Sequence, residues 1–376
     1  MASLPYNILT ISWDPTLASD SGDYGDAQKR NIAYGAYVAN LFSVTYSKKS
    51  SRLGNKKLSD NVFIFPTNSR NPISFLWDAW LIAKDICQKN QIDLVLTQDP
   101  FLTAWVGIWL KRKFSCKLLI HFHGDFFANE QWRQEAWVNR FLLILGHWTV
   151  TKADALRVMS QGIKEKLIKF GLPTKIIRVI PTPVDLEKFN NLAEVDFKPH
   201  DILSVGRLVA AKDFPTLIAA AKIIFQRYPD LHLKIIGQGP EYNNLKKIVQ
   251  DSPFIDIVGA VDHDDLPAEY NQCSVFVMSS TNESFGKVLV EANACAKPVV
   301  STATTGAVSI VRDGYNGYLV PIGDPSALAE KIIYLFEHAS ESKAMGLNGQ
   351  KLVRELFSDN TEKIAEFWSD IINNKL

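Results

Sequence analysis

The sequence contains little cysteine, and what there is excludes two kinds of site. Only four of the 376 residues are cysteine: Cys87, Cys116, Cys273 and Cys295. They lie far apart in mostly apolar settings and show no CxxC spacing. This pattern predicts buried free thiols in a reducing compartment and argues against a disulfide framework or a zinc site.

The sequence also lacks a net charge and long apolar runs. Lys and Arg number 41 and Asp and Glu 40, so the formal charge is +1 and gives no electrostatic reason to expect nucleic acid as a partner. A membrane-spanning helix needs roughly 20 apolar residues, and the longest run here, at 141–146, is far shorter. The first residues contain no basic stretch followed by an apolar one, so no signal peptide is predicted. We expect a cytoplasmic globular protein with two domains.

Short β-branched runs alternate with helical patterns, which predicts an α/β fold with parallel sheets covered by helices. The proline-spaced segment 181–199 is predicted to link two doubly wound units. Strands are expected at 7–12, 62–65, 93–97, 117–122, 155–160 and 176–180, and then at 202–206, 231–237, 255–258, 275–278, 298–301 and 317–320. Helices are expected at 28–41, 73–89 and within 357–376, the last with an inner face of Ile364, Phe367, Trp368 and Ile371.

The part of the sequence most informative about function is SSTNESFGKVLVEANACAKPVV, residues 279–300. Phe285-Gly286 is expected to open a helix after a strand and a polar loop. A helix N-terminus suits a diphosphate, and a carboxylate can accept two hydrogen bonds from a vicinal diol. Glu283 in the loop and Glu291 in the helix are therefore candidate ligands of a sugar nucleotide, although two glutamates alone are more often surface charge. The inward positions of this helix are expected to be Val288, Leu289, Ala292 and Cys295.

Two cations precede a helix in SVGRLVAAKDFPTLI, residues 204–218. Arg207 can bind two phosphate oxygens with its guanidinium and Lys212 adds a mobile point charge, so the pair can stabilise a departing nucleoside diphosphate. Taken alone, such a pair is usually surface charge. Because these cations supply the charge that a metal would bring, no metal is expected. The Asp-His-Asp spelling at 262–264 fits a loop and helix start better than a metal site.

The first half offers a histidine pair and a glycine loop. His121 and His123 fall on one face at the end of a predicted strand, so a metal pair has to be considered, yet no third ligand stands at a telling spacing. In the loop 19–30, Gly25 can let backbone N–H groups approach a phosphate or an acceptor, and Asp26 is alternatively an N-cap. In the second half, the turn at 237–239 lacks the third glycine of a dinucleotide fingerprint, so no nicotinamide cofactor is expected.

Together these motifs resemble the retaining glycosyltransferases of family 4, which have the GT-B fold, over nearly the whole chain. The E-x7-E signature of the family corresponds to the two glutamates, and its VGRL…K element to the two cations. Asn293 stands where the family usually has an apolar residue, and Ala296 where it usually has glycine. The resemblance implies two Rossmann-like doubly wound domains that face a cleft. Residues 1–180 would be the acceptor domain, with the C-terminal helix 357–376 crossing back onto it, and 181–356 the nucleotide-sugar donor domain.

The resemblance also implies roles for single residues. Arg207 and Lys212 hold the diphosphate, Glu283 acts at the reacting sugar and Glu291 holds the ribose. His123 best matches the polar group that orients the donor sugar, and His121 is the second choice. Further donor-binding positions are implied at Gly25, Gly237, Val261, Phe285, Gly286 and Lys287.

The implied reaction is transfer of a hexosyl group from a UDP- or GDP-sugar to a hydroxyl of a glycan or lipid-linked glycan, with no cofactor and no metal. Front-face departure and attack is favoured, because no carboxylate is obviously placed as a nucleophile on the opposite face; a covalent intermediate through Glu283 is the lesser alternative. Two other classes stay open. One is an epimerase or phosphorylase of the same fold, although a phosphorylase would need a pyridoxal lysine and a longer chain. The other is a non-catalytic sugar-nucleotide-binding module, which would be expected to lose the cations or the glutamates.

One segment bears on location. Residues 129–145 combine two tryptophans, two arginines and an apolar run, a composition typical of a helix in a membrane interface. The favoured alternative is a helix buried against the first-domain core, because the basic excess is small. The sequence thus predicts a cytoplasmic enzyme with, at most, weak peripheral contact at the inner membrane face.

Overall fold

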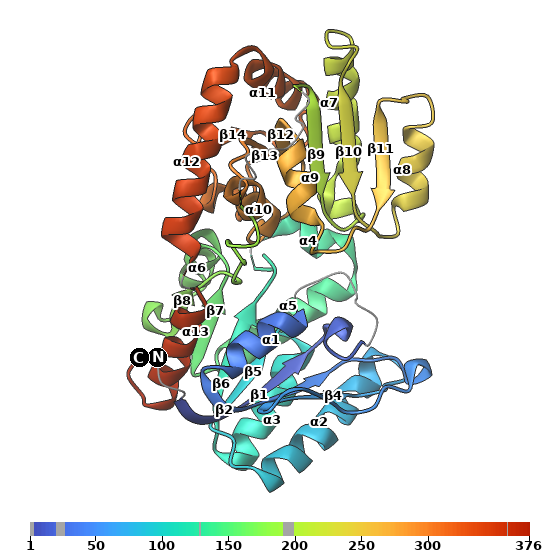
Figure 1. Cartoon of the computed structure of the whole chain (residues 1–376). Helices are drawn as coiled ribbons and strands as arrows, with labels where there is room; N and C mark the ends of the chain where they lie inside the picture. Colours follow the sequence, from blue (N-terminus) through green and yellow to red (C-terminus); the bar gives the residue numbers. More distant parts are fainter. Residues whose placement is uncertain (1–3, 20–26, 128, 191–198, 359) are drawn as a thin grey trace. The chain divides into compact units, whose positions relative to one another are not determined.

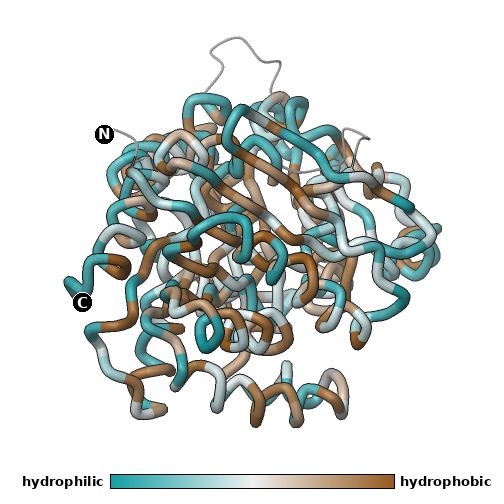
Figure 2. The backbone as a smooth tube through the Cα atoms, turned by 90° about the horizontal axis from the view of Figure 1, so that it is seen from below, coloured by the Kyte–Doolittle hydropathy of each residue, from teal (hydrophilic) through white to brown (hydrophobic). Residues whose placement is uncertain are grey.

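The computed structural model describes residues 4–19, 27–127, 129–190, 199–358 and 360–376, and the chain divides into two compact units (Figure 1). Unit 1 comprises Met1–Pro181 and Asp359–Leu376, and unit 2 comprises Thr182–Ser358. Each unit is a largely parallel sheet covered by helices, the α/β class that the sequence predicts. Figure 2 shows apolar and hydrophilic residues alternating along the helices, as expected where one helix face packs on a sheet.

The sheet of unit 1 has eight strands in the order β3-β4-β2-β1-β5-β6-β7-β8. All neighbouring strands are parallel except the antiparallel pair of β3 and β4. The strands are β1 (Leu4–Ser12), β2 (Val38–Thr45), β3 (Lys56–Ser59), β4 (Val62–Pro66), β5 (Leu94–Thr97), β6 (Lys117–Phe122), β7 (Ala155–Val158) and β8 (Ile177–Val179). The helices are α1 (Ala27–Gly35), α2 (Pro72–Lys89), α3 (Leu102–Phe114), α4 (Glu130–Glu135), α5 (Val138–Val150), α6 (Gln161–Lys169) and α13 (Asn360–Ile372).

The C-terminal helix α13 packs on the core of unit 1. Its side chains Ile364, Phe367, Trp368 and Ile371 are buried in one cluster with residues of the sheet. The Trp368 ring meets the Tyr34 ring edge-on, at 5.6 Å between centroids. The amphipathic spacing in the sequence therefore identifies the buried face of this helix.

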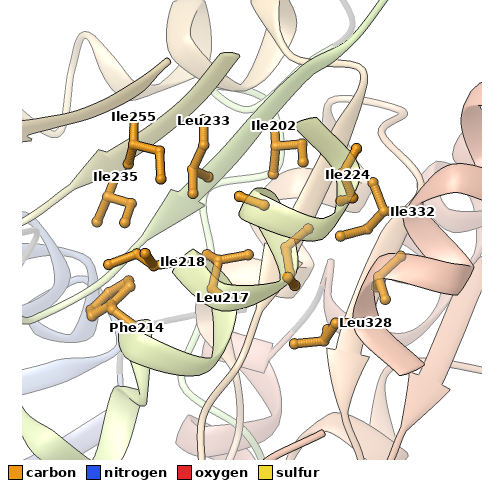
Figure 3. Close-up of a cluster of buried hydrophobic side chains, with 14 of the residues drawn as sticks. Ile202, Phe214, Leu217, Ile218, Ile224, Leu233, Ile235, Ile255, Leu328 and Ile332 are labelled. Carbon is orange, nitrogen blue, oxygen red and sulfur yellow. The ribbon is translucent and has the colours of Figure 1, made fainter. Parts of the chain in front are cut away.

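The sheet of unit 2 has six parallel strands in the order β11-β10-β9-β12-β13-β14. The strands are β9 (Asp201–Val205), β10 (His232–Ile236), β11 (Ile255–Gly259), β12 (Val275–Met278), β13 (Val299–Thr302) and β14 (Gly317–Val320). The helices are α7 (Phe214–Phe225), α8 (Tyr242–Ile248), α9 (Leu266–Gln272), α10 (Lys287–Ala294), α11 (Pro325–Glu337) and α12 (Ala339–Phe357). Figure 3 shows the core where α7 lies between the strands and α11, with Leu217 and Ile218 turned toward the strands and Ile224 toward Ile332.

Two sequence expectations about the fold are wrong. The helix expected at 28–41 ends at Gly35, and Val38–Thr45 forms strand β2. Leu41 and Phe42 continue the apolar spacing of a helix. They nevertheless belong to strand β2, which is buried in the sheet and contacts α1 and α2. The segment 181–199 is also not a simple linker, because Phe189 is fully buried in unit 2 and meets the rings of His263 and Tyr270 edge-on.

None of the helices in the described part of the chain combines the length and the apolarity needed to cross a lipid bilayer.

Candidate functional site

Two of the predicted site residues meet at the carboxyl edge of the unit 2 sheet. Lys212 follows β9 and Glu283 follows β12, the adjacent strands at which the strand order reverses. The Lys212 ammonium forms an ion pair with Glu283 Oε2, and the two side chains are only 19% and 16% exposed. Ligands of doubly wound sheets bind beyond this switch point. The contact therefore brings together, across 71 residues of sequence, the cation and the carboxylate that motif reasoning had selected separately.

Backbone contacts fix the two loops that carry this ion pair. The N–H of Thr281 donates to the carbonyl of Ala211 at 2.9 Å, which ties the loop after β12 to the loop after β9. The N–H of Gly306 donates to the carbonyl of Glu283 at 2.8 Å. A Cβ at Gly306 would lie 2.5 Å from the backbone nitrogen of Phe285, so only glycine permits this close approach. The Glu283 carboxylate is thus held by rigid surroundings.

The predicted cation Arg207 differs from Lys212 in its surroundings. Its side chain is exposed, and it forms no hydrogen bond or ion pair with the residues that the structure describes. The Lys212 side chain folds back along Gly206, where a Cβ would lie 3.5 Å from Lys212 Cε. One cation of the loop after β9 is therefore open to an external anion, while the other is balanced by Glu283.

Glu291 is almost fully buried, so its interpretation as surface charge is wrong. The carboxylate is 2% exposed and accepts a hydrogen bond from the Tyr270 hydroxyl at 2.8 Å on Oε2. Lys287 Nζ lies 3.4 Å and His263 Nε2 3.5 Å from Oε1. Burial alone would raise the pKa of this carboxyl, but the Lys287 charge, His263 and Tyr270 outweigh burial and hold the pKa below its ordinary value. The group is a charged carboxylate in a buried polar network.

Two members of this network, Tyr270 and Lys188, carry no sequence signal that we recognised. Burial and the adjacent Glu291 charge raise the pKa of Tyr270 well above its ordinary value, which keeps the hydroxyl a neutral donor. Lys188 Nζ lies 2.7 Å from His263 Nδ1 and 2.6 Å from a carboxylate oxygen of Asp264. A lysine donates only, so Nδ1 accepts from Lys188, while Nε2 lies 3.5 Å from both Glu291 Oε1 and Lys287 Nζ.

His263 and Asp264 of the Asp-His-Asp sequence at 262–264 therefore belong to this network. In the described ranges, no group of three or more His, Cys, Asp or Glu side chains is arranged to hold a metal ion.

The remaining donor-binding positions have mainly structural surroundings. The Phe285 ring is buried and meets Phe357 edge-on at 5.5 Å, and Gly286 has φ +86°, a conformation that favours glycine, just before α10. A Cβ at Gly237 would lie 1.8 Å from the Gly206 carbonyl oxygen, so this glycine allows two loops to touch. Val261 is half-buried in the loop after β11. The inner face of α10 includes Val290, while Val288, expected inside, is only half-buried.

In unit 1 the predicted histidines lie at the end of β6. His121 is 3% exposed, neither of its ring nitrogens has a hydrogen-bond partner, and it pairs in register with Arg157 of β7. Burial, the Arg157 charge and then His123 hold the pKa of His121 well below its ordinary value. His123 is exposed, with its ring 5.6 Å from that of His121. Gly25 lies outside the described residues.

We expect His121→Phe to reduce the loss of stability in acid. The folded-state pKa of His121 is depressed, so below pH about 6.5 the unfolded chain binds a proton that the native chain does not. The neutral His121 ring therefore makes its full contribution to the free energy of unfolding above that pH. This contribution falls as the pH drops, by at most about 1.4 kcal/mol per pH unit. Urea unfolding at pH 7.5 and pH 5.5 measures this, with exposed His338→Phe as control. Equal losses in parent and His121→Phe would contradict the assignment.

Comparison with known proteins agrees with this geometry. Residues 42–188 match the family model described as Glycosyltransferase Family 4, and residues 187–352 match that described as Glycosyl transferases group 1. An uncharacterized glycosyltransferase of Methanocaldococcus jannaschii is 31% identical over 285 residues, which is 75% of this chain and 76% of that protein.

Two solved structures share the fold. Sucrose-phosphate synthase from Thermosynechococcus elongatus superposes with a TM-score of 0.85 at 23% identity, covering 98% of this chain and 100% of that one. HepE of Anabaena in complex with UDP-glucose superposes with a TM-score of 0.74 at 20% identity, covering 97% and 99%. The chain therefore belongs to the family 4 glycosyltransferases and has the GT-B fold.

Proposed function

We propose that the protein is a retaining glycosyltransferase that moves a hexosyl group from a UDP- or GDP-sugar to a hydroxyl group of a glycan or lipid-linked glycan. The observation that carries the donor assignment is the Lys212–Glu283 ion pair at the switch point. Lys212 lies in the same loop as the exposed Arg207. The complex of HepE with UDP-glucose supports a nucleotide-sugar donor by analogy.

The contacts suggest a division of roles. A diphosphate that binds Arg207 would compete with Glu283 for the Lys212 ammonium, so donor binding would release the carboxylate toward the sugar. Glu291 would accept hydrogen bonds from the ribose while Tyr270 keeps the carboxylate oriented. The leaving phosphate would then take the proton of the acceptor hydroxyl on the face from which it departs. His123 of unit 1 is proposed to orient the donor sugar.

A donor screen tests the function. Nucleotide sugars with uridine and guanosine are compared for thermal stabilisation, and the stabilising donor is then tested for hydrolysis and transfer. A donor present at 100 times its Kd should add about 2.7 kcal/mol to the stability. Binding without any turnover would favour the non-catalytic module, and no stabilisation by any sugar nucleotide would contradict the proposal.

We expect transfer to continue in excess EDTA. Arg207 and Lys212 supply the positive charge that would otherwise come from a divalent ion. The measurement compares transfer by chelator-treated enzyme with and without added magnesium or manganese. If EDTA abolished activity and either ion restored it, Asp262 and Asp264 would have to be tested as ligands.

We also propose a cytoplasmic location, on the state of the cysteines. All four are buried and free, and burial raises the pKa of Cys273 to about 12. Such thiols are unreactive packing groups, as expected in a reducing compartment.

A further inference from the structure

Three helices of unit 1 form a continuous outer layer that is rich in tryptophan. The Trp80 ring of α2 meets the Trp109 ring of α3 at 5.7 Å between centroids, and Trp105 of α3 meets Trp148 of α5 at 5.9 Å. These contacts place α2, α3 and α5 side by side. Five of the nine tryptophans of the chain belong to these three helices: Trp77, Trp80, Trp105, Trp109 and Trp148.

The outer side of this layer exposes large apolar side chains on both flanking helices. On α2, Ile73, Trp77 and Leu81 recur every fourth residue and are 79%, 60% and 46% exposed. On α5, Phe141 and Ile144 are 63% and 68% exposed. Clusters of exposed apolar residues on the two helices that flank α3 indicate an interaction surface, whereas single exposed apolar residues do not.

The expectation that residues 129–145 form a helix buried against the core of the first domain holds only for one face of α5, which packs through Gly146, Thr149 and Val150, while Phe141 and Ile144 stay exposed. It holds better for Trp132 of α4, whose ring stacks on Phe101 at 5.5 Å and is only partly exposed. The apolar spacing of α5 fits either burial or an interface, and only its packing beside α3 shows which side chains remain outside.

The charges that accompany this layer are positive. The last turn of α3 contains Lys111, Arg112 and Lys113, α5 contains Arg140, and neither helix contains an acidic residue. Lys111 forms an ion pair with Asp154 at 2.7 Å, so the positive charge of this face comes from Arg112, Lys113 and Arg140. Arg112 lies over the Trp148 ring at 5.9 Å from its centroid. The acids of α2 have local partners, since Asp78 accepts from Ser69 and Asp85 pairs with Lys89.

We propose that the outer face of α2, α3 and α5 is a docking surface for a bilayer that contains anionic lipids. Tryptophan prefers the membrane interface, exposed aliphatic side chains gain from burial among acyl chains, and Lys and Arg are attracted to anionic headgroups. Protein interfaces are instead depleted in lysine at their centre, which disfavours a second copy of the chain as the occupant. None of the residues of this surface is among the proposed donor residues.

Vesicle flotation at low salt tests this proposal. The parent protein should float with vesicles of phosphatidylcholine and phosphatidylglycerol, and binding should weaken as salt is added. Phe141→Glu combined with Ile144→Glu should lower the ratio of bound to free protein by about tenfold or more. The control is Leu347→Glu, an exposed leucine on α12 of unit 2, which should bind like the parent. Circular dichroism and donor-induced thermal stabilisation show that each variant is folded.

A second pair of variants separates charge from apolar contact. Arg112→Glu with Lys113→Glu should lower binding to the anionic vesicles while leaving transfer to a soluble acceptor unchanged. Absence of parent binding to anionic vesicles overturns the proposal, as does equal binding by parent and Phe141→Glu/Ile144→Glu. Sedimentation velocity identifies the competing occupant: a parent dimer that this variant dissociates, without any vesicle binding, makes the face a self-interface and the proposal wrong.

Discussion

Replacing Lys212 with alanine is expected to lower the rate of sugar transfer by about 100-fold or more, the usual effect of removing one group that stabilises developing charge. The ammonium lies at the switch point, four-fifths buried, where its charge is weakly screened. Steady-state transfer at saturating donor measures the effect. Lys247→Ala on α8, which removes an exposed lysine of the same unit, is the matched control.

A purely structural ion pair would give a different result. The Lys212→Ala variant leaves Glu283 partly buried without its cation, which lowers stability whatever the catalytic role. Thermal unfolding must therefore be measured beside transfer, at a temperature where each variant is folded. If Lys212→Ala and Glu283→Gln both unfold earlier but keep transfer within about threefold of the parent, neither group stabilises the reacting charge.

The strands of unit 2 could be predicted well from the sequence, whereas two strands of unit 1, β2 and β3, were not predicted. Val275–Met278 and Gly317–Val320 are runs of only four residues between polar or glycine residues, and this short length favours a strand over a helix. Val38–Thr45 follows α1 after two residues and continues its apolar spacing, so local pattern extends the helix. Pairing with β1 and β4 overrides that pattern, and no short window of sequence contains those partners.

The candidate site could also be predicted only in part from local sequence. Lys212, Glu283 and Glu291 stand in motifs whose residue types suit a diphosphate and a ribose, so the sequence could select them. Tyr270 meets Glu291 across 21 residues, and Lys188 meets His263 across 75, from a segment that was expected to be a linker. Their roles depend on side-chain contacts between separate elements, which spacing does not encode.

The two departures from the family pattern also have structural surroundings. Asn293 is fully buried, and its Oδ1 accepts from Asn316 Nδ2 at 2.6 Å, so a polar pair replaces an apolar contact. Ala296 has φ +55°, in the left-handed region that disfavours residues with a Cβ by roughly 1–2 kcal/mol. Glycine at this position would avoid that cost. Asn293 lies in α10 and Ala296 just after it, so both departures follow Glu291 in the sequence.

Glu291→Ala should weaken binding of free UDP or GDP by about 10- to 100-fold, because hydrogen bonds to a charged group contribute roughly 1.5–3 kcal/mol each. Glu291 is the buried carboxylate whose Oε1 faces Lys287 and His263 while Tyr270 holds Oε2. Titration calorimetry with the diphosphate measures the loss. Tyr270→Phe keeps the charge and removes only the orienting hydrogen bond, so a smaller, few-fold loss is expected.

Comparison of nucleoside with pyrophosphate assigns the loss to one part of the donor. If Glu291 binds the ribose, its alanine variant loses affinity for uridine or guanosine and keeps affinity for pyrophosphate, whereas Arg207→Ala does the reverse. Glu283→Ala should bind the free diphosphate nearly as the parent does and lose turnover instead, because its proposed contact is with the sugar. Unchanged nucleotide affinity in folded Glu291→Ala would show that the ribose is held elsewhere and that the buried network serves only to position α9 against α10.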